Sequence, residues 1–131
     1  MQSLRGGIPM ANRDIEEKIV GARTLAAHRL LLAEMPRLGL TPSHNSGHVR
    51  AVRLHDLYDR YVFSWIPNQQ HLLFYIRLPA LNAAPSLKAS AERELPGVSV
   101  NNAGEVTARI EGTEDAQLAL RWLATVLPLP E

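Results

Sequence analysis

The sequence predicts an α+β domain, with an antiparallel sheet of about five strands and helices packed on one of its faces. Three observations lead to this prediction. Apolar residues recur at helical spacing near both ends of the chain, runs rich in branched and aromatic residues stand between them, and short polar segments separate those runs. The expected order is helix, three strands, helix, two strands and helix.

A chain of 131 residues is the size of one domain and is long enough to bury a hydrophobic core. We expect residues 1–12 to form a flexible lead-in. Residues 13–131 should then form a single α+β domain.

The first helix is predicted over residues 14–35, where Ile15, Ile19 and Leu30 belong to a set of apolar residues at helical spacing. Acidic residues occupy its first turn, and Pro36 follows its end. The C-terminal half of this helix is apolar on nearly every side. More than one surface must therefore cover it.

Three strands are predicted next, over residues 48–55, 60–66 and 71–78, after the polar loop TPSHNSG. The second and third strands are rich in aromatic and branched residues, and the segment PNQQ between them fits a short hairpin. We therefore expect these two strands to pair.

The rest of the chain predicts a helix, a hairpin and a final helix. The helix over residues 85–95 stands between two prolines. The run VSVNNAGEVTARI predicts a hairpin that turns at NNAG. The final helix is expected over residues 113–127, with Thr113 as its N-terminal cap and Pro128 after its end.

Composition limits the classes of protein to consider. The chain has no cysteine, which excludes disulfide bonds, a thiolate nucleophile and cysteine-ligated metals. Its formal net charge is +1, from 14 basic and 13 acidic residues, so the total charge predicts no attraction to membranes or nucleic acid. No apolar run approaches the roughly 20 residues that cross a bilayer, and the N-terminus has no hydrophobic signal core. We therefore expect a cytoplasmic protein without a membrane partner.

Residues 43–61, SHNSGHVRAVRLHDLYDRY, hold three histidines and two aspartates in 19 positions. Such density suggests a metal or acid/base site. We expect a loop that runs into a strand instead, because His48 and His55 are an odd number of positions apart and leave a strand on opposite faces. His44 and His48 have the spacing that binds a metal on a helix, but the neighbouring proline and glycine disfavour a helix. No metal site is predicted, and His44 and His48 are only outside candidates.

The two aspartates of the same stretch, Asp56 and Asp59, are expected in a turn, which aspartate stabilises by accepting hydrogen bonds from the nearby backbone. No nucleophile elbow, phosphate-binding loop or dinucleotide-binding glycine pattern occurs elsewhere. We therefore predict no catalytic residue, no cofactor and no enzymatic activity.

The strand over residues 60–66 leaves two orientations open, because two sets of side chains alternate along it and either set can face the helices. One set is Tyr61, Phe63 and Trp65, and the other is Val62, Ser64 and Ile66. If the aromatic set points toward the helices, it belongs to the core. If it points away, it extends an apolar surface edged with arginine.

The candidate binding residues on that surface are Trp65, Leu73, Tyr75, Arg77 and Arg109. Aromatic residues and arginine are enriched at protein interfaces, so the surface suits a homodimer or an unknown protein partner. It equally suits single-stranded nucleic acid, whose bases stack on aromatic rings.

The order of elements resembles that of the class I type III secretion chaperones. The local likeness lies in LLAEMPRLGL at the end of the first helix, in the hairpin VSVNNAGEVTARI, and in a final helix with Trp122 and Leu123. Those chaperones are small homodimers that bind an unfolded segment of an effector protein. The resemblance therefore implies an α+β homodimer with a chaperone-like role. The strand GEVTARI running into an amphipathic helix is also similar to small α+β domains that accompany nucleases.

These observations favour a non-enzymatic interaction module in the cytoplasm, chaperone-like or an adaptor, that forms a homodimer and binds an unknown protein partner. The first alternative is a nucleic-acid-binding accessory domain that uses Tyr75, Arg77, Arg109 and Trp65. The second alternative is a metal-dependent hydrolase built on histidine and aspartate.

Overall fold

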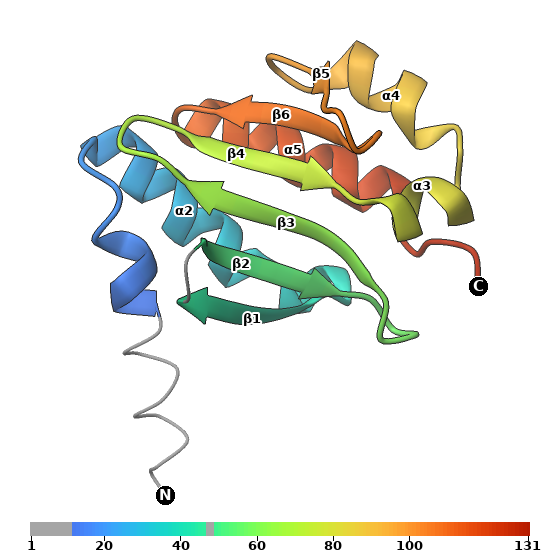
Figure 1. Cartoon of the computed structure of the whole chain (residues 1–131), viewed down its shortest axis with the longest axis horizontal. Coiled ribbons are helices and arrows are strands. Elements are labelled where there is room, and N and C mark those ends of the chain that lie inside the picture. The colour runs from blue at the N-terminus through green and yellow to red at the C-terminus, as the bar shows by residue number, and fades with distance from the viewer. Residues whose placement is uncertain (1–11, 47–48) are drawn as a thin grey trace, which may run out of the picture.

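The computed structural model describes residues 12–46 and 49–131 (Figure 1). Residues 12–16 form a short helical turn. The elements that follow are α2 (Ala22–Glu34), the 3-10 turn η1 (Pro36–Leu38), β1 (Thr41–Ser46), β2 (Arg50–His55), β3 (Tyr61–Pro67), β4 (Leu72–Ile76), α3 (Leu78–Ala83), α4 (Leu87–Glu94), β5 (Ser99–Val100), β6 (Val106–Ile110) and α5 (Thr113–Val126).

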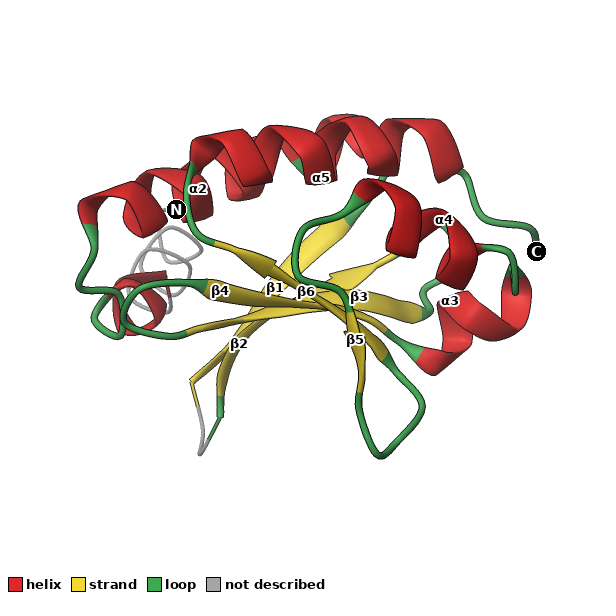
Figure 2. Ribbon diagram, turned by 90° about the horizontal axis from the view of Figure 1, so that it is seen from above, coloured by secondary structure: helices red, strands yellow, loops and turns green. Residues whose placement is uncertain are grey.

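The strands form one antiparallel sheet in the order β1-β2-β3-β4-β6-β5. Helices α2 and α5 lie side by side along one face of this sheet, and α3 and α4 lie at one end of it (Figure 2). The predicted α+β architecture with helices on one face is therefore confirmed. The sheet has six strands rather than about five.

The core lies between the sheet and the pair α2 and α5, and aromatic rings from three elements fill it. Phe63 on β3 packs against Phe74 on β4 with ring centroids 5.8 Å apart, and against Trp122 on α5 at 6.1 Å. Trp122 also donates a hydrogen bond from Nε1 to Ser90 Oγ on α4 at 2.7 Å. This contact joins α4 to α5. The ring of Trp122 is thus packed in the core while its Nε1 hydrogen has a hydrogen-bond acceptor.

The prediction of one long helix over residues 14–35 is wrong, because the chain bends between the helical turn at residues 12–16 and α2. At the bend, the amides of Val20 and Gly21 both donate to the carbonyl of Gln69 in the β3–β4 turn, each at 2.9 Å. A Cβ atom on Gly21 would lie 2.6 Å from the side-chain oxygen of Gln70. A tertiary contact thus interrupts a continuous helical pattern, while Ile15 stays fully buried.

Two further elements differ from the prediction. The segment expected as a polar loop forms β1, which lies at the edge of the sheet and pairs only with β2. Its polar sequence fits an edge strand, because one side of such a strand has no neighbouring strand. The strand expected to run to residue 78 ends at Ile76, and α3 follows, with Pro79 in its first turn.

The remaining predicted elements are confirmed with small shifts of their bounds. β3 pairs with β4, and β5 pairs with β6 across the turn that contains Gly104, whose φ is +86°. α5 ends one residue before the predicted bound, and Gly112 rather than Thr113 occupies its N-cap. Among the described residues, no helix has the length and apolar character needed to cross a membrane.

Leu54 and Leu57 offer a matched test of this core, since Leu54 on β2 is fully buried and Leu57 is 75% exposed. We expect Leu54→Ala to lower the free energy of unfolding by about 2–5 kcal/mol, through lost burial and the cavity left behind. Leu57→Ala should change it by no more than about 0.5 kcal/mol. Urea denaturation of both variants measures the difference, and equal losses would contradict the placement of β2 in the core.

Candidate functional site

A β-bulge between β2 and β3 decides which aromatic side chains face the helices. Leu54 lies opposite Phe63 and His55 lies opposite Tyr61, so Val62 is an extra residue in β3. Without it, Tyr61 and Phe63 would share a face, because side chains alternate along a strand. With it, Phe63 and Trp65 face the helices while Tyr61 points to the other side.

The face of the sheet that α2 and α5 do not cover is called the open face here. Directly paired residues share a face, so one row on it runs Arg53, Ser64, Tyr75 and Thr107 across four strands. A second row contains Ile66, Leu73 and Arg109. Ser64 and Thr107 are nearly buried between larger neighbours, whereas Leu73, Tyr75 and Ile66 are half-buried.

Tyr61 lies at the centre of a stack on the open face. The guanidinium carbon of Arg77 lies 3.9 Å from the centre of the Tyr61 ring, and that of Arg53 lies 5.5 Å from it. The His55 ring is stacked beside it, with centroids 5.4 Å apart and planes 30° apart. Cations over an aromatic ring are attracted by its negative face, so these contacts hold Tyr61 in one orientation.

An ion pair anchors one end of this stack. Arg77 Nε donates to Glu105 Oε2 at 3.0 Å, and the Glu105 side chain is only 13% exposed. Asn101 donates to the other Glu105 oxygen at 3.1 Å, and its own oxygen accepts the amides of Ala103 and Glu105. The β5–β6 loop, which projects on the side of the open face in Figure 2, is thereby fixed against the sheet.

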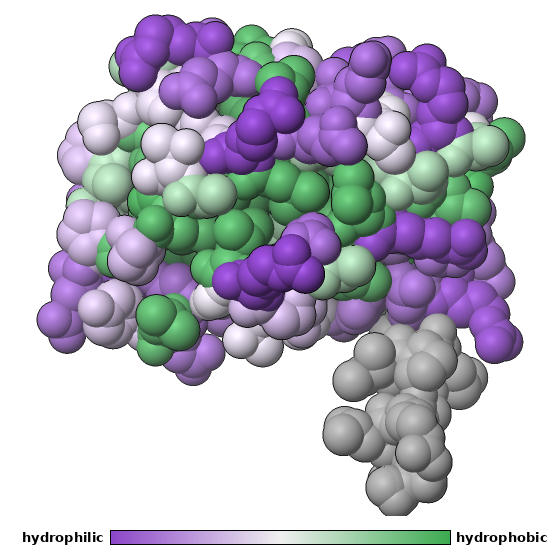
Figure 3. Space-filling view, turned by 180° about the vertical axis from the view of Figure 1, so that it is seen from behind, coloured by the Kyte–Doolittle hydropathy of each residue, from purple (hydrophilic) through white to green (hydrophobic). Residues whose placement is uncertain are grey.

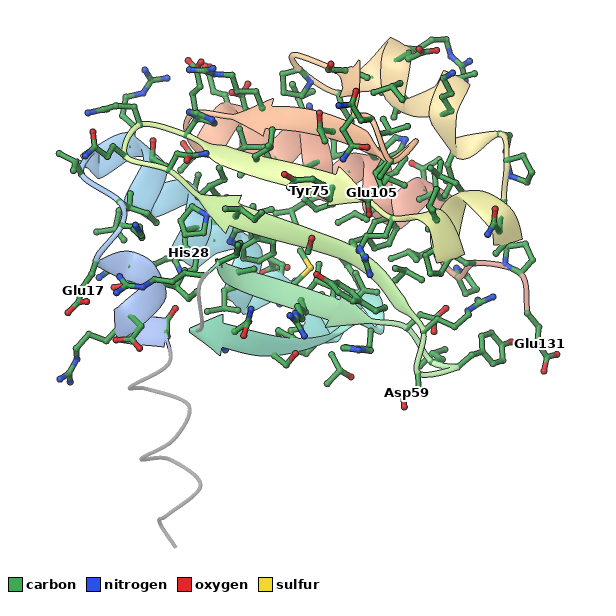
Figure 4. The ribbon with its side chains drawn as sticks, viewed as in Figure 1. Glu17, His28, Asp59, Tyr75, Glu105 and Glu131 are labelled. Atoms are coloured by element: carbon green, nitrogen blue, oxygen red, sulfur yellow. The ribbon has the colours of Figure 1, made fainter. Side chains whose placement is uncertain are left out.

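Tyr75 is the titratable group at the middle of the open face. Burial raises the pKa of its hydroxyl, and the nearby Glu105 carboxylate and Tyr61 raise it further. Figure 4 shows Tyr75 and Glu105 close together in front of the sheet, with His28 on the far side. The Tyr75 hydroxyl therefore stays protonated at neutral pH and can donate a hydrogen bond to a ligand.

Four of the five predicted binding residues are brought together on the open face: Leu73, Tyr75, Arg77 and Arg109. Trp65 is not among them, because it is fully buried on the helix side. The candidate binding residues did not include Arg53, His55 or Glu105, and the sequence placed Tyr61 on this surface only together with Phe63 and Trp65. Alternation along β2 places Arg53 and His55 on one face, but the bulge that brings Tyr61 to them has no signal in the residues.

Trp65 and His28 form a buried hydrogen bond that joins β3 to α2. Trp65 Nε1 donates to His28 Nδ1 at 3.0 Å, and His28 Nε2 lies 2.8 Å from Asn12 Oδ1. Because an indole can only donate, Nδ1 must be the unprotonated nitrogen and Nε2 carries the proton. Asn12, the last residue of the predicted lead-in, in turn donates to Glu16, which Arg29 binds at 2.8 and 2.9 Å.

The interior keeps His28 neutral. Burial lowers the pKa of its imidazole to about 4, although the nearby Glu16 carboxylate favours the charged form. Both ring nitrogens are already engaged with Trp65 and Asn12. His28 is therefore a structural residue, and neither of its ring nitrogens is free to bind a metal or to transfer a proton.

The two described histidines of residues 43–61, His44 and His55, lie on opposite faces of the sheet. His44 on β1 lies opposite Val52 on the helix side of the sheet, and its buried Nε2 has no hydrogen-bond partner among the residues that the structure describes. His55 is on the open face, and His48 lies outside the described residues. Within residues 12–46 and 49–131, no three histidine, aspartate or glutamate side chains are grouped to hold a metal ion.

The predicted role of the aspartates in a turn is confirmed. Asp56 Oδ1 accepts the amides of Tyr58 and Arg60 at 2.9 and 3.0 Å, and its other oxygen binds the Arg60 side chain. Asp59 has a φ of +61°, a left-handed conformation that aspartate tolerates. Both carboxylates belong to the β2–β3 turn and not to a shared site.

Comparison with known proteins finds no relative of this chain. No family model, no curated protein and no solved structure matches the chain. Any functional conclusion therefore rests on the surfaces described above.

The buried His28 predicts a pH dependence of stability. Its folded pKa of about 4 is below its ordinary value of 6.5, so the unfolded chain binds this proton more readily between those values. Stability should therefore fall as pH falls through this window, by about 2 kcal/mol between pH 7 and pH 5 from His28. His44 and His71, whose pKa values burial also lowers, act in the same direction.

Denaturation at both pH values, with His28→Gln as the comparison, isolates this contribution, because glutamine does not titrate. We expect a smaller loss in the variant. An imidazole pKa near 6.5 for His28 in an NMR titration of the folded protein would contradict the prediction.

Proposed function

We propose that this chain is a non-enzymatic interaction module, chaperone-like or an adaptor, that acts in the cytoplasm and binds an extended segment of another protein across the open face. One observation carries the proposal. The stack of Arg53, Tyr61 and Arg77 lies on the same face of the sheet as the half-buried Leu73 and Tyr75, and neither α2 nor α5 covers that face.

The chemistry of the open face supports a protein ligand. Tyrosine and arginine are enriched among residues that dominate binding energy at protein interfaces. Tyr61 and Arg77 are held in place by their mutual contact and by Glu105, so little side-chain entropy is lost when a ligand binds them. Leu73 and Ile66 offer apolar contacts, while Tyr75 can donate a hydrogen bond to a backbone carbonyl.

The edges of the sheet are less suitable for binding by strand addition. The edge strand β1 contains Pro42, which has no amide hydrogen, and the opposite edge strand β5 has only two residues. Both features are ones that proteins use to prevent pairing at sheet edges. The open face rather than an edge is therefore the binding surface in this proposal.

Single-stranded nucleic acid is a second candidate, because the Arg53 and Tyr61 pair is of the kind on which bases stack. Two other arginines of the open face are already neutralised. Arg77 pairs with Glu105 at 3.0 Å, and Arg109 pairs with Glu111 at 2.8 Å. Phosphates would have to compete with these carboxylates, so the protein ligand is favoured.

A selection from a random peptide library displayed on phage tests the proposal. We expect the wild-type chain to enrich peptides whose affinity falls at least about tenfold in Tyr61→Ala, since removing a central aromatic anchor costs about 1.4 kcal/mol or more. Tyr58→Ala is the matched control, because Tyr58 also lies under an arginine, Arg60, but in the β2–β3 turn. The affinity of Tyr58→Ala for the selected peptides should match that of the wild type.

Two outcomes would overturn the proposal. The first is the absence of enriched peptides, or peptides that bind Tyr61→Ala and the wild type equally well. The second is tight binding of an oligothymidine at low salt that weakens steeply as salt rises and is lost in Arg53→Glu. That result would support the nucleic-acid candidate instead.

A further inference from the structure

The helix layer has an outer side that points away from the sheet and carries many apolar residues. On α2, the residues buried toward the sheet are Thr24, Ala27, His28 and Leu31. On the opposite side of the helix, Ala26 and Ala33 are exposed, and Leu30 beside them is half-buried. Figure 3, which shows this side of the molecule, has a hydrophobic patch across the helix layer with hydrophilic residues around it.

Helix α5 contributes a line of exposed residues to the same side. Ala116, Ala119, Trp122 and Leu123 face the core, while Glu114, Leu118 and Arg121 are exposed, Leu118 to 36%. Residues three and four positions apart are neighbours on a helix surface. Leu118 therefore stands between an acidic residue one turn before it and a basic residue one turn after it.

The surface is also hollowed where the two helices begin. An open hollow of about 410 Å³ is lined by Ala22, Arg23, Ala26, Thr113 and Glu114, from both α2 and α5. The name outer helix face is used below for the surface formed by six residues of α2 and α5: Ala26, Leu30, Ala33, Glu114, Leu118 and Arg121. It combines small residues, which allow close approach, with larger apolar side chains.

The charges on α5 are self-complementary. Glu114 and Arg121 are seven residues apart, which is almost two full turns, so both point to the same side. Neither forms an ion pair with any residue in the described parts of the chain. If α5 pairs antiparallel with a copy of itself about a two-fold axis between Gln117 and Leu118, Glu114 meets the partner's Arg121, and Arg121 meets the partner's Glu114.

We propose that the outer helix face is the contact between two copies of this chain, related by a two-fold axis that crosses α5 between Gln117 and Leu118. In this dimer Leu118 packs near the axis, and two ion pairs flank it. Two-fold contacts use the same surface on both copies, so the surface must complement itself, as the order of acidic, apolar and basic residues on α5 does. The contact lies on the helix side of the sheet and is independent of the open face.

Charge reversal on the full chain tests this dimer by sedimentation equilibrium over a range of protein concentrations. Glu114→Arg places arginine against the partner's Arg121, and Arg121→Glu places glutamate against the partner's Glu114. We expect each single variant to raise the dimer dissociation constant at least about tenfold, because like charges are then apposed twice. The double variant Glu114→Arg/Arg121→Glu should return to within about threefold of the wild type, since opposite charges meet again.

A control substitution and a chemical cross-link complete the test. Arg93→Glu on the exposed side of α4 changes the net charge as Arg121→Glu does and should leave the dimer unchanged. Because the chain has no cysteine, Leu118→Cys introduces a single thiol that a short bifunctional thiol reagent should join to its copy near the axis. Leu57→Cys, exposed in the β2–β3 turn, should give no such product.

Three outcomes would overturn the proposal. These are a wild-type chain that is monomeric at all concentrations, a dimer that neither single variant weakens, and a dimer that the double variant does not restore. Circular dichroism of each variant shows that α5 is intact, and the cross-link gives an answer that does not depend on charge. Peptide binding on the open face is measured separately, so failure of the dimer leaves the proposed function standing.

Discussion

The fold depends first on how Phe63 and Trp65 are buried beneath α5 and α2. Phe63 packs against Trp122, and Trp65 donates its indole hydrogen to His28, so each helix is tied to β3 by one aromatic ring. Cross-strand partners share a face, so these two residues also assign the core faces of β2 and β4. The bulge at Val62 then gives Tyr61 the opposite orientation. One face of the sheet becomes core, and the other receives the stack of tyrosine, arginine and histidine.

The parts of the fold that depend on local patterns in the sequence were predictable. The β3–β4 and β5–β6 hairpins, α4 and α5 follow from strand-like runs, turn residues and helical spacing, and the structure has them. The bend at Gly21 was not predictable, because it depends on hydrogen bonds to Gln69, far away in the sequence. Edge strand β1 was missed for a related reason, since its polar residues do not alternate with apolar ones and its pairing comes from β2.

Prediction of the candidate site from the sequence was limited in the same way. Alternation along β4 and β6 correctly grouped Leu73, Tyr75 and Arg109, because both strands are regular. In β3 alternation fails at one residue, so the aromatic set divides, with Tyr61 on the open face and Trp65 in the core. The ion pair of Arg77 with Glu105 joins residues 28 positions apart, and no sequence spacing indicates it. Parity arguments therefore hold only until the first bulge.

The two proposed contacts use opposite sides of the sheet, and this has a consequence for how they would act together. The outer helix face belongs to α2 and α5, and the open face lies beyond the sheet from both helices (Figure 2). A dimer joined through the helix layers therefore leaves both open faces exposed, directed away from each other. A single short peptide cannot span them, so each copy would bind its own ligand independently. A long unfolded chain that reached around the dimer would occupy both, and its second binding event would gain from the high effective concentration that the first one creates. This geometry favours long extended partners over short ones, which suits a chaperone-like role better than recognition of a compact surface.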